Sequence, residues 1–239
     1  ATSPNLSALA LACSACLTMG WTQHAHAQAL PQGGQVVAGQ GSIQTAGSTM
    51  TINQSTAKMA VNWDSFSVGQ GNTVNFVQPS ASAVALNRVL GSDVSVIQGA
   101  INANGQVFLL NPNGIVFGRT AQVNVGGLVA SSLKLSDQDI LSGKFALNQG
   151  SGAGAVRNFG EIIAREGGLV ALVAPQVENQ GTIRADGGQI ALAAGDKVRL
   201  ELGQGGLISV NVDGGVAQAQ IDNSGSLLAD GGKIWMTAR

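Results

Sequence analysis

The second half of the chain alternates apolar and polar or small residues in short runs that repeat. The shared pattern is [VI]-x-N-x-G-x-[IL]-x-A, a short gap, and then G-G-x-[VI]-x-[LM]-x-A; copies lie at 156–174, 177–194 and 221–238. An alternation with a period of two predicts β-strands, and Asn and Gly between the runs predict turns. Each copy therefore predicts two or three short strands joined at corners.

The spacing of the copies indicates a repeat of about twenty residues. Asn158 and Asn179 are 21 positions apart, and Asn179 and Asn223 are 44 apart, which fits two periods with a weaker copy between them. Residues 205–210, Gly-Gly-Leu-Ile-Ser-Val, are the candidate for that weaker copy. We therefore expect regular coils over 155–239.

Strands this short need neighbours, because an isolated pair is only marginally stable. A stack of coils supplies them, since each coil pairs with the coils before and after it and the inward Val, Ile, Leu and Ala side chains fill the interior. The Gly-Gly corners would supply positive φ. Asn158, Asn179 and Asn223 would align as a structural amide ladder. The fold class predicted is all-β, a parallel β-helix.

Toward the N-terminus the pattern persists in a less regular form. Residues 35–39 and 48–52 predict a strand pair, and we expect 30–76 to be an N-terminal cap that shields the end of the stack. Trp63, Phe66 and Phe76 are expected in the core of this cap, with an exposed partner-binding stripe as the alternative. Residues 80–88 predict either a short helix or a bulging loop. The stretch 133–154 predicts an excursion outside the coil, with one or two helical turns at 136–141 because Ser136 is a suitable N-cap.

Composition excludes some classes of protein. The chain has 34 Gly among 239 residues, 10% charged residues and a formal net charge of −1. Disordered segments combine low hydrophobicity with high net charge, so this composition argues against disorder. A near-neutral chain also lacks the positive field that nucleic-acid binding requires, and we expect no nucleic-acid partner.

The first 29 residues differ from the rest and predict a signal peptide with a truncated start. An uncharged apolar run at 6–21 precedes small-x-small cleavage sites, and we expect cleavage between Ala29 and Leu30, with Gln28 as the alternative new N-terminus. Both cysteines, Cys13 and Cys16, and both histidines, His24 and His26, lie in this segment. The mature chain then has neither disulfides nor the commonest metal ligands, so we assign no cofactor and no metal.

The sharpest local motif is Asn111-Pro112-Asn113-Gly114-Ile115. Pro presets φ at the first corner position and Asn-Gly tolerates positive φ, so the motif predicts a tight turn between strands at 105–110 and 115–117.

Several segments together resemble the two-partner-secretion domain of the filamentous haemagglutinin and high-molecular-weight adhesin family, over essentially the whole mature chain. The matching segments are 30–40 (LPQGGQVVAGQ), 60–66 (AVNWDSF), 75–79 (NFVQP), 84–89 (VALNRV), 111–115 (NPNGI) and 121–130 (AQVNVGGLVA).

The resemblance implies a right-handed β-helix that crosses the inner membrane through the general secretory translocon. The periplasmic domains of a dedicated outer-membrane transporter would then recognise it, and it would nucleate folding of a large exoprotein at the surface of a Gram-negative bacterium. The family places residues 111–115 among those needed for secretion. The family's other motif, NPNL, is absent, so we assign no transporter-contacting residues. We expect the chain to continue beyond residue 239, and the missing part to carry any contact with host-cell surface glycans.

Two other classes of function stay open at this point: a polysaccharide-active β-helix enzyme and a glycan-binding adhesive module. Asp186, Asp213 and Asp230 each precede Gly-Gly, and Asp186 and Asp230 occupy equivalent repeat positions. Asp before a flexible Gly pair is typical of a corner, so we assign no catalytic residue. Asn53-Gln-Ser55 is a glycosylation sequon, and Asn53 is a possible site of modification.

Overall fold

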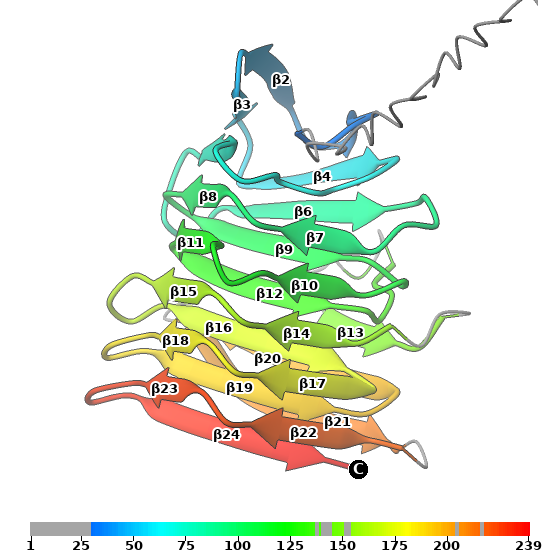
Figure 1. Cartoon of the computed structure of the whole chain (residues 1–239), viewed down its shortest axis with the longest axis vertical. Helices are drawn as coiled ribbons and strands as arrows, with labels where there is room; N and C mark the ends of the chain where they lie inside the picture. Colours follow the sequence, from blue (N-terminus) through cyan, green and yellow to red (C-terminus); the bar gives the residue numbers. More distant parts are fainter. Residues whose placement is uncertain (1–29, 137–138, 140–144, 151–153, 204–205, 216–217) are drawn as a thin grey trace, which may run out of the picture.

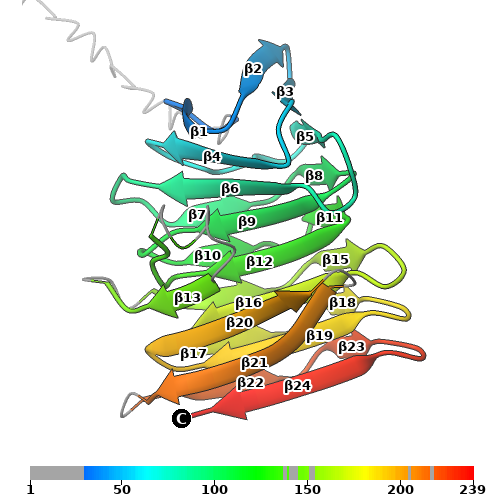
Figure 2. The same ribbon diagram turned by 180° about the vertical axis from the view of Figure 1, so that it is seen from behind.

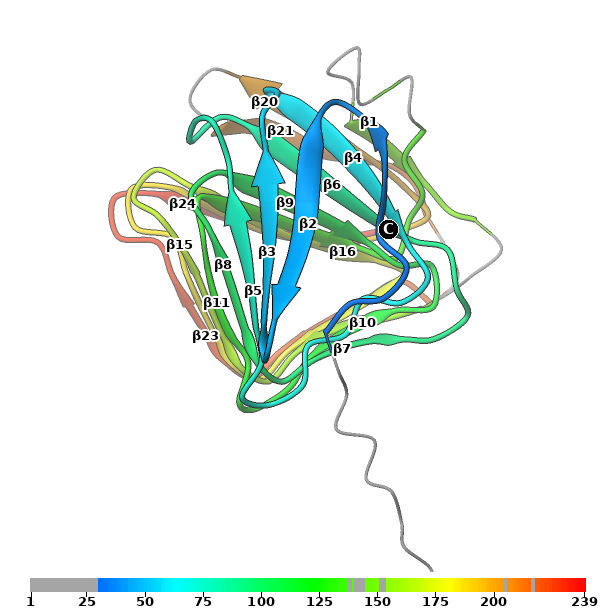
Figure 3. The same ribbon diagram turned by 90° about the horizontal axis from the view of Figure 1, so that it is seen from above.

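The computed structural model describes residues 30–136, 139, 145–150, 154–203, 206–215 and 218–239; the predicted signal peptide, with the cleavage site at Ala29, lies before them. Figure 1 shows a column of strands stacked one coil above the next. Seen along its axis, the column has three faces that enclose the interior (Figure 3). The predicted parallel β-helix is confirmed.

Each face is one sheet, and each coil from β7 onward contributes a strand to faces 3, 2 and 1 in turn. Face 1 comprises β1 (Gln35–Ala38), β4 (Lys58–Trp63), β6 (Val84–Val89), β9 (Gln106–Leu110), β12 (Gly127–Ser131), β16 (Leu169–Ala174), β19 (Gln189–Ala194) and β24 (Lys233–Ala238). Face 2 comprises β2 (Gly41–Ala46), β3 (Thr49–Gln54), β5 (Thr73–Val77), β8 (Ala100–Ala103), β11 (Gln122–Val125), β15 (Glu161–Ala164), β18 (Thr182–Arg184) and β23 (Ser226–Leu228). Face 3 comprises β7 (Ser95–Ile97), β10 (Ile115–Phe117), β14 (Val156–Asn158), β17 (Gln176–Asn179) and β22 (Gln220–Asn223).

The interior is filled by side chains that repeat at the same position of successive coils. On face 2, Val123, Ile162 and Ile183 pair in register and all are fully buried. Polar residues alternate with them and point outward, which is the period-two pattern of the sequence. Burial of such a stack is the main stabilising contribution in a fold with no cysteine in its described part.

The N-terminal end of the column is closed by antiparallel strands. β1 pairs antiparallel with β4, and β2 pairs antiparallel with β3. From β3 onward the coil strands pair in parallel, so the coils begin inside the range 30–76 that was predicted as a cap. Trp63 and Phe66 meet edge to face here, with ring centroids 5.4 Å apart. Both are buried, as is Phe76, which confirms the prediction of a core role.

A fourth sheet lies outside the coil and packs against face 1 (Figure 2). It contains β13 (Phe145–Asn148), β20 (Lys197–Gly203) and β21 (Gly206–Gly214), all antiparallel. A second hydrophobic cluster fills the contact, and it includes Ala171 and Val173 of face 1 with Val198, Leu200 and Val212 of the outer sheet. Face 1 is therefore covered on both sides in this part of the column.

The outer hairpin corrects the prediction for residues 205–210. They were expected to form a coil, but 206–210 belong to β21, which pairs antiparallel with β20. As a result β17 pairs directly with β22, and a single coil step with an insertion spans the 44 positions between Asn179 and Asn223. The prediction was wrong because an alternating strand preceded by Gly-Gly looks the same in a coil and in a hairpin.

The two segments of irregular pattern have different outcomes. Residues 80–83 form a turn, and β6 begins at Val84, so the choice between a helix and a loop for 80–88 was wrong. Val84 and Leu86 are buried outside the coil while Ala85 is buried inside, which hid the alternation. Ser136 accepts a hydrogen bond from the Asp139 amide at 3.2 Å, but 137–138 and 140–144 fall outside the described residues.

The paired glycines at the corner from face 2 to face 1 have separate tasks. Gly187 has a φ of +61°, whereas the next residue, Gly188, does not have positive φ. A Cβ at Gly188 would instead clash with the carbonyl oxygen of Gly168 in the coil before it. The first glycine of the pair thus turns the chain, and the second lets two coils approach closely.

Within the residues described, no helix combines the length and the apolar character that a membrane span requires.

Candidate functional site

The predicted tight turn is present at 111–115, where the chain passes from β9 on face 1 to β10 on face 3. The Gly114 amide donates to the Asn111 carbonyl oxygen at 2.9 Å, which closes the turn. The Asn113 amide donates to the Asn111 side-chain oxygen, also at 2.9 Å. Gly114 has a φ of +111°, a conformation that other residues rarely adopt. The motif therefore forms a turn that its own first side chain reinforces.

The turn is bonded to the segment that precedes it in the stack. Asn111 is fully buried, and its Nδ2 donates to the Asp93 carbonyl oxygen and to Ser95 Oγ, both at 2.9 Å. Asn113 Nδ2 donates to the Gly91 carbonyl oxygen at 2.8 Å. Two side-chain amides thus satisfy backbone groups that no strand ladder reaches.

The same turn is bonded to the coil that follows. The Asn111 amide donates to the Ser131 carbonyl oxygen at 2.9 Å, and the Gly154 amide donates to the Pro112 carbonyl oxygen at 3.2 Å. A Cβ at Gly154 would clash with the backbone between Asn113 and Gly114. The turn therefore links three successive levels of the column.

An apolar pocket of about 360 Å³ lies beside the turn. Pro112 and Leu133 line it, and Leu90 on its edge is 62% exposed. Its two cationic lining residues are Lys134 and Arg88, and Arg88 donates to the Leu135 carbonyl oxygen at 3.1 Å. The pocket places exposed apolar surface and positive charge next to the motif.

The structure brings the three ladder asparagines together at the end of face 3. Asn158 Nδ2 donates to Asn179 Oδ1 at 2.8 Å, and Asn179 Nδ2 donates to Asn223 Oδ1 at 2.7 Å. Asn158 and Asn179 are fully buried. Asn158 Oδ1 also accepts the Gly160 amide at 3.1 Å, so the Asn-x-Gly part of the repeat is one hydrogen-bonded corner.

Sequence reasoning missed a second buried amide ladder, near the N-terminus. Gln78 Nε2 donates to Gln54 Oε1 at 3.1 Å, and Gln78 Oε1 accepts the Gly105 amide at 3.0 Å. The signal was the equivalent placement of the two glutamines, each two positions after a buried apolar residue, Ile52 or Phe76. It was overlooked because Gln, unlike Asn, is not a typical turn residue.

The three aspartates that were considered as candidate catalytic residues do not lie together in one site. Asp186 and Asp230 occupy stacked turns, where Gly187 donates to the Asp230 carbonyl oxygen at 2.7 Å. Asp186 pairs with Arg184 at 2.7 Å, whereas Asp213 lies on the outer hairpin and pairs with Arg199 at 2.8 Å. Among the described residues, no three His, Cys, Asp or Glu side chains form a group that could hold a metal ion. Asn53 is half-buried on β3.

Comparison with known sequences identifies the domain. The sequence model of the TPS secretion domain matches residues 27–239. The chain belongs to the TPS secretion-domain family. It is 39% identical over 181 residues to a heme/hemopexin-binding protein of Haemophilus influenzae strain Rd; the match covers 72% of this chain and 20% of that protein. A second heme/hemopexin-binding protein of Haemophilus influenzae is 44% identical over 106 residues, which cover 44% of this chain and 11% of that protein.

The fold agrees with a solved member of the TPS family. The HMW1 secretion domain from Haemophilus influenzae superposes with a TM-score of 0.82 at 32% identity, over 87% of this chain and 56% of that one. The described residues thus form a TPS secretion domain, and membership of this family implies interaction with an outer-membrane transporter of the two-partner system. Proteins with this domain are secreted from Gram-negative bacteria, and the family is one of secretion domains. The matched parts are a fifth or less of the curated relatives' length.

Proposed function

We propose that residues 111–115 of this TPS domain serve secretion by fixing the register of the first coils, and that the transporter does not read the motif directly. The supporting observation is the burial of Asn111, whose side chain bonds to Asp93 and Ser95 inside the column. Gly114 and Ile115 are buried as well. A folded domain therefore offers a partner little of this motif beyond Pro112 and Asn113.

Register fixing matters because export across the outer membrane has no nucleotide hydrolysis to drive it. A coil that closes outside the cell opposes backward sliding, but one coil alone is unstable and a nucleus of several must form first. The turn at 111–115 links three levels of the stack through hydrogen bonds to residues 91–95, 131 and 154. Its formation commits all three levels to one register.

The test compares Asn111→Ala with Gln122→Ala, an exposed side chain on face 2. Three quantities are measured: the amount secreted with the cognate transporter, the free energy of unfolding, and the affinity of the urea-unfolded chain for the transporter's periplasmic domains. We expect Asn111→Ala to lower secretion and to lower stability by about 2 kcal/mol, because the Asp93 carbonyl oxygen and Ser95 Oγ lose their donor, while affinity stays unchanged. Loss of affinity at unchanged stability would instead show direct reading of Asn111. Gln122→Ala should change none of the three.

The route to the transporter is a further part of the proposal. The apolar run at 6–21 and the small residues before Leu30 support export through the general secretory translocon into the periplasm, with removal of residues 1–29. N-terminal sequencing of the secreted protein should then begin at Leu30. A start at Gln28 would move the cleavage site, and an intact N-terminus would exclude this route.

We also propose that the whole protein meets its target, such as host-cell surface glycans, through parts outside residues 30–239. The coverage of the relatives, 20% and 11%, supports a domain that exports a much longer protein. Fusing residues 30–239, preceded by a complete signal peptide, to an unrelated β-rich reporter tests whether this domain alone directs export. The fusion should reach the medium only when the transporter is present, and retention in its presence would contradict the proposal.

A further inference from the structure

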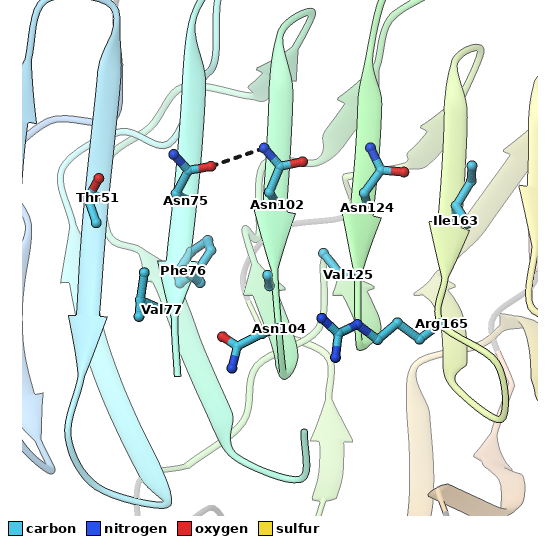
Figure 4. Close-up of a pocket in the computed structure, with 11 residues that line it drawn as sticks. Thr51, Asn75, Phe76, Val77, Asn102, Asn104, Asn124, Val125, Ile163 and Arg165 are labelled. Atoms are coloured by element: carbon cyan, nitrogen blue, oxygen red, sulfur yellow. Dashed lines mark hydrogen bonds between the residues drawn. The ribbon is translucent and has the colours of Figure 1, made fainter. Parts of the chain in front are cut away.

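Three asparagines occupy the same outward position on neighbouring strands of face 2. Asn75 on β5, Asn102 on β8 and Asn124 on β11 pair in register, and Figure 4 shows their amide groups in a row across the sheet. Asn is depleted in strands, where it packs poorly and competes for backbone hydrogen bonds. Three in register in the middle of strands therefore call for an explanation.

The row is not a structural ladder like that of Asn158, Asn179 and Asn223. In the buried ladder every neighbouring pair is bonded. In the outer row Asn102 Nδ2 donates to Asn75 Oδ1 at 3.0 Å, and among the described residues Asn124 makes no side-chain bond. The row thus keeps amide donors and acceptors that are open to solvent.

These amides stand along a groove of about 680 Å³ on the outside of the column. Val77 and Ile163 add apolar surface, and Val77 is 51% exposed. Asn104 forms a fixed part of the rim, because its side chain bonds to the Gln78 backbone amide and carbonyl, both at 2.7 Å. A groove with amides and apolar patches on rigid strands fits a ligand with both hydroxyl groups and C–H faces.

A cation closes one end of the groove. The Arg165 side chain extends from the end of β15 toward Val125 (Figure 4). Among the described residues Arg165 makes no ion pair. Arg184, one coil further on the same face, differs, since its Nε donates to Asp186 at 2.7 Å. That hydrogen bond and the Asp186 charge raise the pKa of the Arg184 guanidinium above its ordinary value. The guanidinium of Arg165 is therefore the one available to an anion in the groove.

We propose that this groove binds a short segment of an acidic polysaccharide, with a uronic acid carboxylate on Arg165 and sugar hydroxyls on Asn75, Asn102 and Asn124. Strands of a sheet repeat every 4.7–4.9 Å, and the asparagines follow that spacing. It is close to the length of one sugar residue in an extended chain, so successive residues would meet successive amides. The glycan runs along the column axis, across the strands. This site is separate from the turn at 111–115 and does not depend on the function proposed for it. It is also distinct from the contact with the host-cell target, which is proposed for parts outside residues 30–239.

The test is a titration of the purified protein with tetragalacturonate, followed by NMR of the side-chain amides, with uncharged cellotetraose as the reference ligand. We expect tetragalacturonate to shift the amide signals of Asn75, Asn102 and Asn124, and cellotetraose to bind more weakly. Arg165→Gln should raise the dissociation constant about tenfold, the effect of losing one charge-assisted pair. Asn124→Ala should weaken binding without changing the backbone spectrum, because the Asn124 side chain has no hydrogen-bond partner in the described part of the chain.

Arg184→Gln is the matched control, a charge removed from the same face outside the groove. It should leave the dissociation constant within about twofold, because Arg184 does not line the groove and its guanidinium already pairs with Asp186. The proposal is overturned if tetragalacturonate shifts none of the three amides, if Arg184→Gln weakens binding as much as Arg165→Gln, or if cellotetraose binds equally well. Normal secretion of the Arg165→Gln protein would separate this site from the export function.

Discussion

Asn179 and Asn223 share a 2.7 Å hydrogen bond although 44 positions separate them in the sequence. The chain leaves the column after β19, forms the β20–β21 hairpin and returns at β22 in the register that it left. The ladder therefore continues across an insertion as if the insertion were absent. This continuity adds the Asn179 side chain to the three strand ladders that join the coils on either side of the hairpin.

The Asn179→Ala substitution should be more destabilising than an ordinary surface change. It removes the acceptor of Asn158 Nδ2 and the donor to Asn223 Oδ1, and it leaves the buried Asn158 amide with only the longer bond to the Gly160 carbonyl oxygen at 3.4 Å. We expect a loss of about 3 kcal/mol in the free energy of unfolding, measured by urea denaturation. Asn148→Ala, which removes one local bond of an exposed side chain, should cost below about 0.5 kcal/mol. Equal losses of stability in the two variants would show that the asparagine ladder contributes no more than an exposed local hydrogen bond.

The β20–β21 hairpin can be deleted, because the equivalent corner one coil earlier has no insertion. There, Pro175 alone connects β16 to β17. Replacing residues 195–219 by a single Pro should therefore close the coil and keep β-rich circular dichroism. The apolar outer side of face 1, including Ala171 and Val173, would become exposed, so the variant should bind a hydrophobic dye and lose roughly 5 kcal/mol of stability.

Leu200→Ala is a less disruptive variant to compare with the hairpin deletion. It keeps the hairpin but removes one side chain from the cluster on face 1, and it should cost about 3 kcal/mol without dye binding. If the shortened chain unfolds altogether while Leu200→Ala stays folded, the outer sheet is required for the coil itself. That outcome would contradict the view of the hairpin as an insertion into a self-sufficient stack.

The sequence predicted the coils well where the pattern depends on neighbours one repeat away. Asn158 and Asn179 stand at the same place in consecutive copies, and a period of two fixes which side chains enter the core. The sequence-based prediction was wrong at 205–210. An alternating pattern shows that a strand has an apolar and a polar side, but it does not show which other strand pairs with it. Pairing of β20 with β21 is decided by the apolar outer side of face 1, which local pattern does not reveal.

The turn at 111–115 shows the same limit on a smaller scale. Asn-Pro-Asn-Gly predicted the turn, because its backbone preferences are local. The bonds from Asn111 to Asp93 and Ser95 depend on a loop one level away, and nothing in the spacing of these residues indicated them. The missed bond from Trp63 Nε1 to Asn87 Oδ1 is of the same kind, since Asn87 is a polar residue inside the coil.

Trp63→Phe tests the bond between Trp63 and Asn87 near the N-terminal end of the column. Phe keeps the edge-to-face contact with Phe66 but removes the donor to Asn87 Oδ1, which lies 3.0 Å from the indole nitrogen. A buried acceptor without its partner should cost about 2 kcal/mol in thermal or urea unfolding. Trp235→Phe, at a partly buried position on β24, should cost less than half of that. A larger loss of stability from Trp235→Phe than from Trp63→Phe would show that the bond to Asn87 contributes little.

The paired glycines allow the sharpest comparison, because two neighbouring residues are needed for different reasons. Gly187 needs positive φ but meets only ordinary contacts, so Gly187→Asn should cost below about 1 kcal/mol, since Asn adopts this conformation readily. Gly188→Ala places a Cβ against the Gly168 carbonyl oxygen and should force the two coils apart, at a cost of about 3 kcal/mol or more. Urea unfolding of both variants measures the two losses of stability and shows which is larger. The reverse order would show that chain reversal, and not the close approach of coils, explains the Gly-Gly repeat.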